Sequence, residues 1–267
     1  MNEKEKNLRR LLRELSPVAV AFSGGVDSTY LLHVAVDELG AEKVLALTAI
    51  SPVYPKHEQA GCRALADSIG VHLLEVEADV LQNPDFVANG RERCYMCKLD
   101  LFGEFQSIIK KSGFDVLLDG SNLDDLADYR PGHKALAELK VQSPLLDAEL
   151  TKNEIRLLSR EAGLSTWNKQ PFACLATRFP YGTKITAARL EQVGRCEAFL
   201  DELGLSNYRV RYHDNIARIE VAPAEISRFL DPDLRQKVSK HFHSAGFEFV
   251  TLDLDGYRTG SMNGPEA

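Results

Sequence analysis

The chain has 267 residues, of which 44% are hydrophobic and 27% are charged, a composition typical of a globular protein with its own core. Its formal net charge of −7 argues against a broad nucleic-acid-binding surface, which is usually basic, although it leaves room for a local basic pocket. The charged first ten residues are unlike a secretory signal, and the apolar runs are too short to span a bilayer. We therefore expect a cytoplasmic protein with no membrane partner.

The first half of the chain alternates between short apolar runs and longer amphipathic segments. We expect strands at 18–22, 43–49, 71–76 and 115–118, and helices at 27–39, 56–69, 95–111 and 151–162. Thr151 and Glu154 form a capping-box pattern at the start of the last of these helices. Strands that alternate with helices of this length predict an α/β fold, in which a doubly wound parallel sheet carries helices on both faces.

The pattern changes near residue 165, where an irregular, proline-containing stretch runs from 167 to 182. After it we expect helices at 187–203, 223–229 and 232–242, and strands at 209–212, 217–221 and 248–254. These elements predict a smaller C-terminal α+β domain. We place the domain boundary between residues 168 and 169, which gives domains at 1–168 and 169–267.

The most specific motif is a glycine-rich turn, Ser23-Gly24-Gly25-Val26-Asp27-Ser28, between the first expected strand and the first expected helix. Glycines let the backbone approach a phosphate closely, and the N–H groups and positive end of the following helix then hold the anion. Ser23 and Ser28 add hydroxyl donors, while Asp27 is suited to orienting the loop or meeting a magnesium ion. We interpret the turn as an ATP-binding loop; the alternative is a glycine turn without a ligand.

A second polar segment follows the fourth expected strand and contains Gly120, Asn122 and Asp125. It falls at the carboxyl edge of the sheet, where ligands bind in open α/β folds. Its carboxylates are suited to magnesium and Asn122 to the nucleotide, whereas the alternative is a polar turn before a solvated helix. Lys98 and Arg130 are further candidate phosphate contacts, although basic side chains on helices are more often simply solvated.

Five cysteines in a reducing compartment are better interpreted as thiols or metal ligands than as disulfides. Cys94 and Cys97 form a C-x-x-C motif on one face of a helix start, which favours thiolates, and Cys174 lies in the irregular stretch. Redox, zinc and iron–sulfur interpretations remain open. Three thiolates on a cubane cluster would leave one iron open, whereas zinc would need a histidine as its fourth ligand. Cys62 and Cys196 fall among apolar neighbours in expected helices, and we assign both to packing.

Taken together, these motifs resemble known proteins at two levels. The Ser23–Ser28 loop resembles that of the N-type ATP pyrophosphatases, or PP-loop superfamily, which make adenylates and release pyrophosphate. Over nearly the whole chain the sequence is similar to the LarE family of ATP-dependent sulfur transferases. The similarity is carried by Ser23–Ser28, Arg93–Lys98, Gly120–Asn122 with Asp124-Asp125, Asp128–Gly132, Cys174–Gly182 and Arg209–Arg211.

The LarE resemblance implies a step in making the nickel-pincer nucleotide of lactate racemase. With ATP and Mg²⁺, such an enzyme adenylylates the carboxylates of pyridinium-3,5-biscarboxylic acid mononucleotide and replaces AMP by sulfur. In one subtype the cysteine that matches Cys174 gives up its own sulfur, and the C-x-x-C pair is absent. In the other subtype three cysteines hold a [4Fe-4S] cluster whose open iron carries a transferable sulfide. With Cys94, Cys97 and Cys174 the chain matches the cluster subtype, with the sulfide donor unknown.

The resemblance also suggests how the substrate is held. Arg178, Arg209 and Arg211 are expected to bind its phosphate, because alternate residues of a strand share a face and paired guanidiniums suit a phosphate. The alternative is a solvated strand face. Glu197 and Glu220 match family carboxylates near a metal site. The resemblance further implies a homo-oligomer, often a hexamer, with the second domain binding substrate and forming the assembly.

Two other functions remain open from the sequence. A cluster-dependent tRNA thiolase of the same superfamily would need a basic RNA surface, which the net charge of −7 argues against. A non-catalytic module that binds ATP or stores iron would bind nucleotide without substrate-dependent release of pyrophosphate. We expect a small-molecule nucleotide substrate and no nucleic-acid partner.

Overall fold

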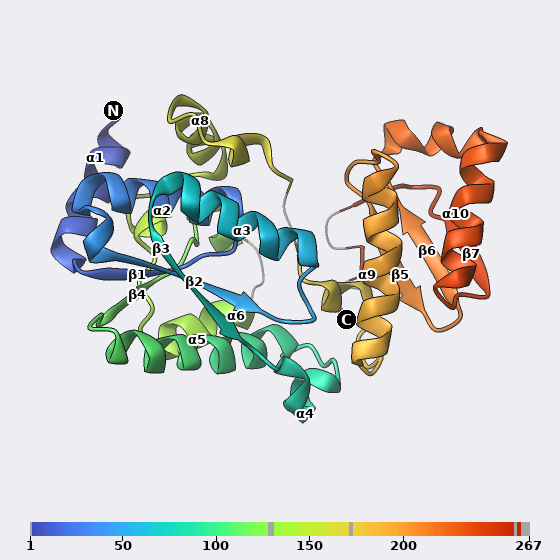
Figure 1. Ribbon diagram of the computed structural model, residues 1–267, viewed down its shortest axis with the longest axis horizontal. Coiled ribbons are helices and arrows are strands. Elements are labelled where there is room, and N and C mark those ends of the chain that lie inside the picture. Colours follow the sequence, from blue (N-terminus) through green and yellow to red (C-terminus); the bar gives the residue numbers. More distant parts are fainter. Residues whose placement is uncertain (1, 128–130, 171–172, 259–260, 263–267) are drawn as a thin grey trace. The chain divides into compact units, whose positions relative to one another are not determined.

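The computed structural model describes residues 2–127, 131–170, 173–258 and 261–262 (Figure 1). The chain forms two compact units. The first comprises Met1–Ser51, Lys56–Val80 and Glu92–Phe172, and the second comprises Pro52–Pro55, Leu81–Arg91 and Ala173–Ala267. The main division thus falls four residues after the boundary predicted from the sequence, and two early segments belong to the second unit.

The first unit is built on a sheet of four parallel strands in the order β3-β2-β1-β4. The strands are β1 (Val18–Ala21), β2 (Val44–Ile50), β3 (His72–Glu77) and β4 (Val116–Leu118). Val18 of the central strand pairs with Val44 on one side and with Val116 on the other. Because β2 and β4 flank β1 on opposite sides, the winding of the chain reverses at β1, and this is where open α/β sheets bind ligands.

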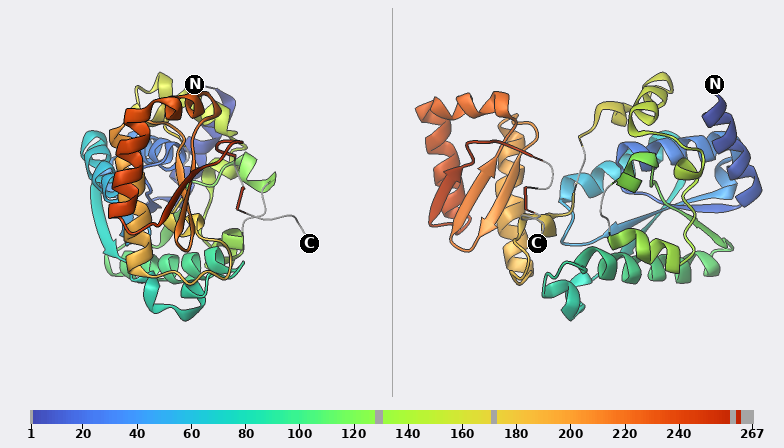
Figure 2. Two further views of the ribbon diagram at one scale, coloured as in Figure 1. Left: turned by 90° about the vertical axis from the view of Figure 1, so that its right-hand side faces the viewer. Right: turned by 180° about the vertical axis from the view of Figure 1, so that it is seen from behind.

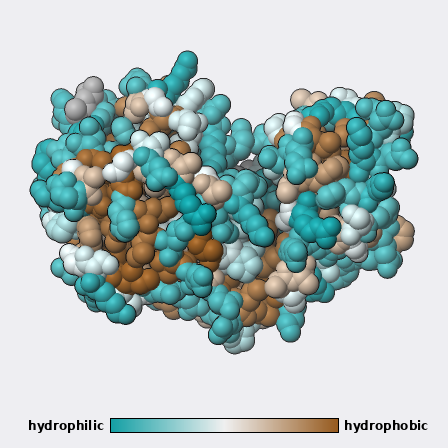
Figure 3. All heavy atoms as spheres, viewed as in Figure 1, coloured by the Kyte–Doolittle hydropathy of each residue, from teal (hydrophilic) through white to brown (hydrophobic). Residues whose placement is uncertain are grey.

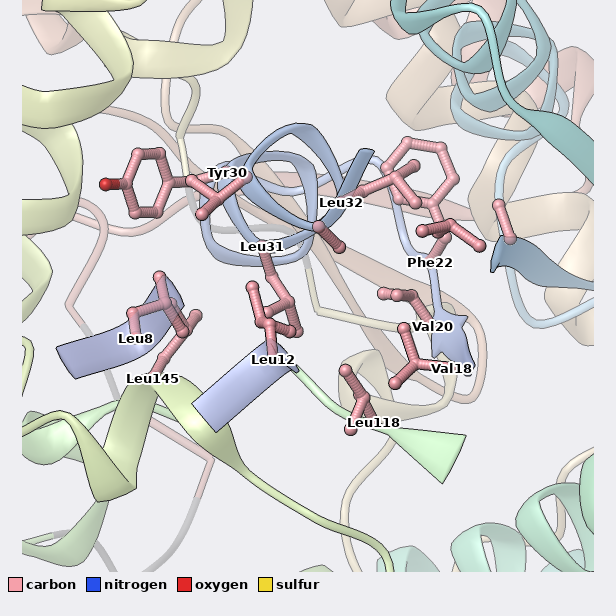
Figure 4. Close-up of a cluster of buried hydrophobic side chains, with 14 of the residues drawn as sticks. Leu8, Leu12, Val18, Val20, Phe22, Tyr30, Leu31, Leu32, Leu118 and Leu145 are labelled. Carbon is pink, nitrogen blue, oxygen red and sulfur yellow. The ribbon is translucent and has the colours of Figure 1, made fainter. Parts of the chain in front are cut away.

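Helices cover both faces of this sheet, which confirms the predicted doubly wound α/β fold. They are α1 (Glu3–Leu15), α2 (Val26–Leu39), α3 (Lys56–Ile69), α5 (Arg93–Lys111), α6 (Pro131–Glu138), α7 (Pro144–Asp147) and α8 (Lys152–Glu161). Successive residues of β1 point into different cores: Val18 and Val20 pack with α1 and α2, whereas Ala19 packs with α5. Figure 4 shows the first of these cores, with Leu12 of α1 beside Leu31 of α2.

Helix α1 is the main element that the sequence analysis missed. It begins after Asn2, whose side-chain oxygen accepts the N–H of Glu5 at 2.8 Å, and it buries Leu8 and Leu12 against α2 and α7. An N-cap of this kind together with a narrow apolar stripe is the local signature of an amphipathic helix. Apart from the helix expected at 223–229, the predicted helices and strands of both halves occur, and their ends differ from the predictions by a few residues at most.

The second unit contains a three-stranded sheet in the order β5-β6-β7. Its elements are α4 (Pro84–Val87), α9 (Ala187–Glu202), β5 (Arg209–His213), β6 (Ile216–Glu220), α10 (Pro232–Ser244) and β7 (Phe249–Leu252). Strands β5 and β6 form an antiparallel hairpin, and β7 runs parallel to β6. Helix α9 packs on β5 and α10 packs on α9 and β7, so the unit is an α+β structure (Figure 2). The expected helix at 223–229 is a 3₁₀ segment, Pro223–Leu230.

Hydrogen bonds explain why the early segments belong to the second unit. The fully buried side chain of Asn89 donates to the carbonyl oxygens of Pro180 and Thr183, at 2.8 and 3.0 Å. The backbone carbonyl of Asn89 accepts the N–H of Gly182 at 3.0 Å. In the same way the carbonyl of Val53 accepts an N–H of the later chain at 2.8 Å. Both early segments are therefore held to the later one by hydrogen bonds to its backbone, and those of the Asn89 side chain satisfy a buried amide.

Polar side chains cover most of the face that Figure 3 displays, and apolar residues gather on the first unit between α3 and α5. Edge strand β3 lies there, and its Leu73 and Leu74 are only half-buried. Within the described part of the chain, every helix is too short or too polar to cross a membrane.

Candidate functional site

The glycine-rich loop joins β1 to α2 at the point where the winding of the sheet reverses. Gly25 precedes the first residue of α2, and its carbonyl accepts the N–H of Thr29 at 3.0 Å. Gly24 has a φ of +67°, and a Cβ atom there would lie 2.9 Å from the Sγ of Cys62. The backbone fold and the close packing thus both require glycine at 24. The first N–H groups of α2 have no partner within the helix, as anion binding requires.

The two serines of the loop are joined by long hydrogen bonds. Their hydroxyl oxygens lie 3.1 Å apart, and the Ser28 Oγ also accepts the N–H of Ser23 at 3.3 Å. The N–H of Gly25 donates to the Ser23 Oγ at 3.4 Å. Such distances are at the weak end of the range for protein hydrogen bonds. A phosphate oxygen can therefore replace these contacts at little cost to the loop.

The segment after β4 lies directly against the loop, as the sequence predicted. A Cβ atom on Gly120 would come within 3.0 Å of the backbone nitrogen of Ser28, so this position also needs glycine. The Asn122 amide donates to the carboxylate of Asp27 at 3.3 Å, and the Asn122 N–H donates to Asp125 at 3.0 Å. Eight of the ten predicted nucleotide contacts thus lie in the loop or in the segment packed against it, at one edge of the sheet.

Lys152 is a residue of this site that the sequence analysis missed. It is the first residue of α8, directly after the capping residue Thr151, and its ammonium forms an ion pair with Asp27. Burial raises the pKa of the Asp27 carboxyl above its ordinary value, and the Lys152 ammonium opposes that rise. A cation at the positive end of a helix is locally unfavourable. A lysine at this unfavourable position is the one signal in the sequence by which Lys152 could have been found.

Lys169 is a second lysine at the loop, and nothing in its sequence neighbourhood signalled it. Its ammonium lies 3.0 Å from the carbonyl oxygen of Gly24 and 2.6 Å from the carboxylate of Glu58, in the first turn of α3. The Arg156 guanidinium of α8 donates to the carbonyls of Trp167 and Lys169, each at 2.8 Å. Helix α8 therefore holds the backbone from which Lys169 reaches the loop.

Two further predicted phosphate contacts have different outcomes. Lys98 lies on α5 with its stem against Gly132 of α6, where a Cβ atom would come within 2.7 Å of the lysine. Its ammonium sits 5.7 Å from the centre of the Phe102 ring. Arg130 falls outside the described residues. A phosphate role for either residue remains a prediction.

The three candidate sulfur-handling cysteines are divided between the units. Cys94 is exposed and Cys97 is half-buried, both in the first two turns of α5 in the first unit. Residues three apart on a helix share a face, so the two thiols point the same way. Cys174 is half-buried in the second unit and directly precedes a 3₁₀ turn, Leu175–Arg178.

Cys62 and Cys196 are buried, as their assignment to packing predicts. Burial raises the pKa of both thiols, that of Cys196 to about 12, so neither is a thiolate near neutral pH. Among the residues that the structure describes, no three histidine, cysteine, aspartate or glutamate side chains form a group that could hold a metal ion.

Arg178 occupies a buried position in the second unit. Its guanidinium binds both carboxylate oxygens of Glu197, at 2.8 and 2.9 Å, with both side chains almost fully buried. The same guanidinium donates to the carbonyls of Ala173 and Cys174, at 2.9 and 3.3 Å. Glu197 also accepts the N–H of Val210 at 2.9 Å. The pair therefore fixes the backbone around Cys174 to α9 and β5.

Glu220 is the centre of a similar buried pair. Its carboxylate accepts the Arg211 guanidinium at 2.7 and 2.9 Å and the hydroxyl of Ser261 at 2.9 Å, and Arg218 approaches it at 3.3 Å. Glu197 and Glu220, the predicted metal carboxylates, thus each bind arginine in this structure. Their role near a metal remains a prediction.

Arg209 differs from the other two arginines. Its guanidinium lies 5.0 Å from the centre of the Tyr257 ring and donates to the carbonyl of Tyr208 at 2.7 Å. Burial, together with the positive charge of Arg178, lowers the pKa of the Arg209 guanidinium. A group whose charge is disfavoured in this way gains most from an anion that binds beside it.

A parallel sheet that carries a Ser-Gly-Gly-x-Asp-Ser loop where its winding reverses defines an α/β protein of the PP-loop superfamily. No family model matches the chain. It is 38% identical over 260 residues to the pyridinium-3,5-bisthiocarboxylic acid mononucleotide synthase of Lactiplantibacillus plantarum, covering 97% of this chain and 94% of the synthase. The chain therefore belongs to the LarE family of this synthase.

Two other similarities fit this assignment. The chain is 40% identical over 263 residues to the uncharacterized protein slr1717 of Synechocystis, covering 98% of both chains. It is 29% identical over 193 residues to the tRNA(Ile)-lysidine synthase of Pseudomonas fluorescens, covering 61% of this chain and 40% of that enzyme. The more distant similarity supports membership of the wider superfamily.

Proposed function

We propose that the chain is an ATP-dependent sulfur transferase that converts pyridinium-3,5-biscarboxylic acid mononucleotide into its bisthiocarboxylic product. The observation that carries this proposal is the 38% identity to a synthase of that product over nearly the full length of both chains. The product would serve nickel-pincer nucleotide synthesis, with a lactate racemase as the final client. The loop at the carboxyl edge of the sheet supports the use of ATP. Its small residues let a phosphate come close to the N–H groups at the start of α2.

The activation step consists of one displacement. A substrate carboxylate oxygen attacks the α-phosphorus of ATP, the bond to the β-phosphate oxygen breaks, and pyrophosphate leaves with its charge. The N–H groups at the start of α2 and the hydroxyls of Ser23 and Ser28 would hold that charge. Asp27 and Asp125, which Asn122 joins, would hold Mg²⁺ against the phosphates.

The sulfur step replaces AMP. Sulfide attacks the carbonyl carbon of the acyl adenylate, a carbon–sulfur bond forms, and AMP leaves with the oxygen. We propose Cys94, Cys97 and Cys174 as the residues that would hold a [4Fe-4S] cluster, and the cluster would supply this sulfide when bound. The placement of Cys94 and Cys97 three residues apart at an accessible helix start suits two ligands of one cluster. Cys62 and Cys196 do not compete because burial keeps both protonated.

The substrate phosphate is assigned to the arginine cluster of the second unit. Arg178 and Arg211 are bound to buried glutamates, so we assign them an indirect role. Their positive charges lie near Arg209 and add to its attraction for an anion. Arg209 then binds the phosphate. This assignment refines the sequence-based expectation that all three arginines contact it.

We also propose a homo-oligomer, with a hexamer as the first form to test. Large apolar side chains are exposed on the second unit, among them Leu230, Phe249 and Leu254. Phe249 belongs to edge strand β7, and an exposed apolar edge invites association. Light scattering of the wild type and of Phe249→Ser would show whether this edge carries the contact.

The decisive experiment is an anaerobic assay with ATP, Mg²⁺ and the biscarboxylic mononucleotide. Mass spectrometry would follow both the small molecules and the protein. We expect substrate-dependent pyrophosphate release, a thiolated product and an unchanged protein mass when the cluster is reconstituted. A protein mass lower by one H₂S per transferred sulfur would show sacrifice of Cys174 instead.

Controls separate the remaining possibilities. Reconstituted protein should show iron–sulfur absorbance, and Cys94→Ala should lose both the absorbance and thiolation while keeping ATP binding. Absence of bound iron after reconstitution would refute the cluster. Pyrophosphate release without dependence on the mononucleotide would refute the substrate assignment, and binding of bulk tRNA in a gel shift at moderate salt would favour the tRNA thiolase.

A further inference from the structure

The PP-loop of this chain carries no lysine of its own. The sequence Ser23–Ser28 contains two glycines, two serines and an aspartate, whereas the kinase-type loop Gly-x-x-x-x-Gly-Lys-Ser/Thr supplies an ammonium for the β- and γ-phosphates. Backbone N–H groups alone give partial charges. A site that binds a triphosphate and stabilises a departing pyrophosphate gains from a full positive charge brought from elsewhere in the chain.

The electrostatics of the loop sharpen this requirement. Asp27, Asp125 and Glu58 place three carboxylates on or beside the loop. Polyphosphate entering this edge would meet their repulsion unless positive groups or Mg²⁺ offset it. In the described residues two ammonium groups touch the loop or its aspartate, those of Lys152 and Lys169.

The two lysines are held in different ways. Lys152 is paired with Asp27, so its ammonium and the Mg²⁺ assigned to that carboxylate compete for the same oxygens. Lys169 is paired with Glu58, which has no other part in the activation step. The side chains of both Lys169 and Glu58 keep some exposure to solvent, at 28% and 15%. Because solvent reaches both side chains, water can solvate the Glu58 carboxylate when its ammonium partner turns to phosphate.

We propose that Lys169 binds the β- and γ-phosphates of ATP and the pyrophosphate that leaves. Glu58 holds the lysine ammonium at the loop while the site is empty, and phosphate replaces Glu58 on binding. The four-carbon side chain of lysine permits this exchange without backbone movement. Arg156 keeps the backbone of Lys169 in place, since it binds the carbonyl oxygen of that residue at 2.8 Å. The inference rests on the proposed use of ATP.

The test compares the binding of three probes, each with Mg²⁺: ATP, inorganic pyrophosphate and AMP. Lys169→Met keeps the side-chain length and removes the charge. We expect it to weaken ATP and pyrophosphate binding by about 10- to 100-fold, the effect of one charged hydrogen bond, and to leave AMP binding within about twofold. Isothermal titration calorimetry on the full chain measures all three. Lys110→Met, an exposed lysine of α5, is the matched control and should bind all probes as the wild type does.

Glu58→Gln separates phosphate binding from a structural role. If Glu58 only binds the Lys169 ammonium while the site is empty, Glu58→Gln should bind ATP as tightly as the wild type or more tightly. If the ion pair instead holds the loop together, Glu58→Gln and Lys169→Met should weaken ATP and AMP alike, and the proposal is wrong. Unchanged ATP affinity in Lys169→Met would also overturn it while leaving the use of ATP intact. A wild type that binds neither ATP nor pyrophosphate would refute the proposed function together with this inference.

Discussion

The phosphate loop of the first unit and the arginine cluster of the second are both suited to anions, but they are built in opposite ways. The loop is made of main-chain groups and small residues, and close packing against Cys62 and Ser28 leaves room for nothing larger than glycine at two positions. The cluster is made of long charged side chains, and two of its guanidiniums are bound to buried glutamates. The phosphate loop thus depends on close packing, whereas the arginine cluster depends on ion pairs that balance its buried charges.

This difference has an energetic consequence. The N–H groups of Ser23 and Gly25 in the loop make long hydrogen bonds, so an altered loop loses binding more than stability. Buried charges have already left water, and each depends on its partner for compensation. Changes in the loop should therefore appear mainly in ATP chemistry, whereas changes in the cluster should appear mainly in unfolding.

The largest expected effect is that of Glu197→Ala. It leaves the Arg178 guanidinium buried without its carboxylate, and removing one partner of a buried pair costs about 3–5 kcal/mol of unfolding free energy. Hydrogen exchange of α9 and β5 should report the loss. Fluorescence of Trp167, the single tryptophan, follows the first unit and should change less.

Two variants test the cause of that effect. Glu191→Ala removes an exposed glutamate from the same helix and should change stability by about 0.5 kcal/mol or less. Replacing both partners, as Arg178→Met with Glu197→Leu, should destabilise less than Glu197→Ala, because no uncompensated charge is left. The loss that stays is that of the hydrogen bonds to Ala173, Cys174 and Val210. Equal stability of Glu197→Ala and Glu191→Ala would contradict the balanced-charge description.

The next effect is that of Gly24→Ala on ATP chemistry. The new Cβ atom would clash with the Sγ of Cys62 and strain a residue whose φ is +67°. The loop must shift, and a displacement of about 1 Å at a reacting group can lower the rate by about 100-fold. Substrate-dependent pyrophosphate release is the measurement, and stability should fall by only about 1–2 kcal/mol.

Gly70→Ala is the matched control for the loop. Gly70 has a φ of +77°, yet a Cβ atom there would meet nothing within 4 Å. This variant should show a similar loss of stability and normal pyrophosphate release. If both variants lose release to the same extent, then the close packing of the loop is not what matters.

The smallest effect concerns the start of α8, which carries Lys152. Thr151→Ala removes the capping box with Glu154 and should lower the unfolding free energy by about 1 kcal/mol. Hydrogen bonds from Lys4 and the Thr151 backbone lower the pKa of Glu154 from 4.5 to about 2. The contribution of the Glu154 carboxylate to the unfolding free energy is therefore fully present above about pH 4.5 and is lost as the pH falls toward 2.

Urea unfolding at pH 7 and at pH 2.5 measures this effect. The gap between wild type and Thr151→Ala should narrow at the lower pH, where the Glu154 carboxyl approaches protonation. A gap that stays constant across this range would show that the Glu154 carboxylate takes no part in the cap.

The sequence was sufficient for those parts of the site that are local in the chain. The loop, the C-x-x-C motif and the segment after β4 each consist of neighbouring residues, and their flanking strands were predicted within a few residues. Lys169 and Glu58 could not be predicted as neighbours of the loop, because Glu58 lies on α3 and Lys169 follows the 3₁₀ turn Ser165–Asn168. Only tertiary packing brings both to the loop. The ion pairs of Glu197 and Glu220 with Arg178 and Arg211 could not be predicted either, because nothing in the spacing of α9 and β6 indicates that guanidiniums bind these carboxylates. The predicted role of the two glutamates near a metal stays a prediction.

The buried Asn89 has a consequence for dissecting this protein. Its side chain and backbone satisfy groups of residues 180–183, which lie some ninety positions later in the sequence. A fragment that begins at Ala173 would lack both this asparagine and the strip around Val53, and it would leave their hydrogen-bonding partners exposed to water. The second unit is therefore discontinuous, and a protease that cuts near residue 172 should nick the chain without releasing an independently folded half.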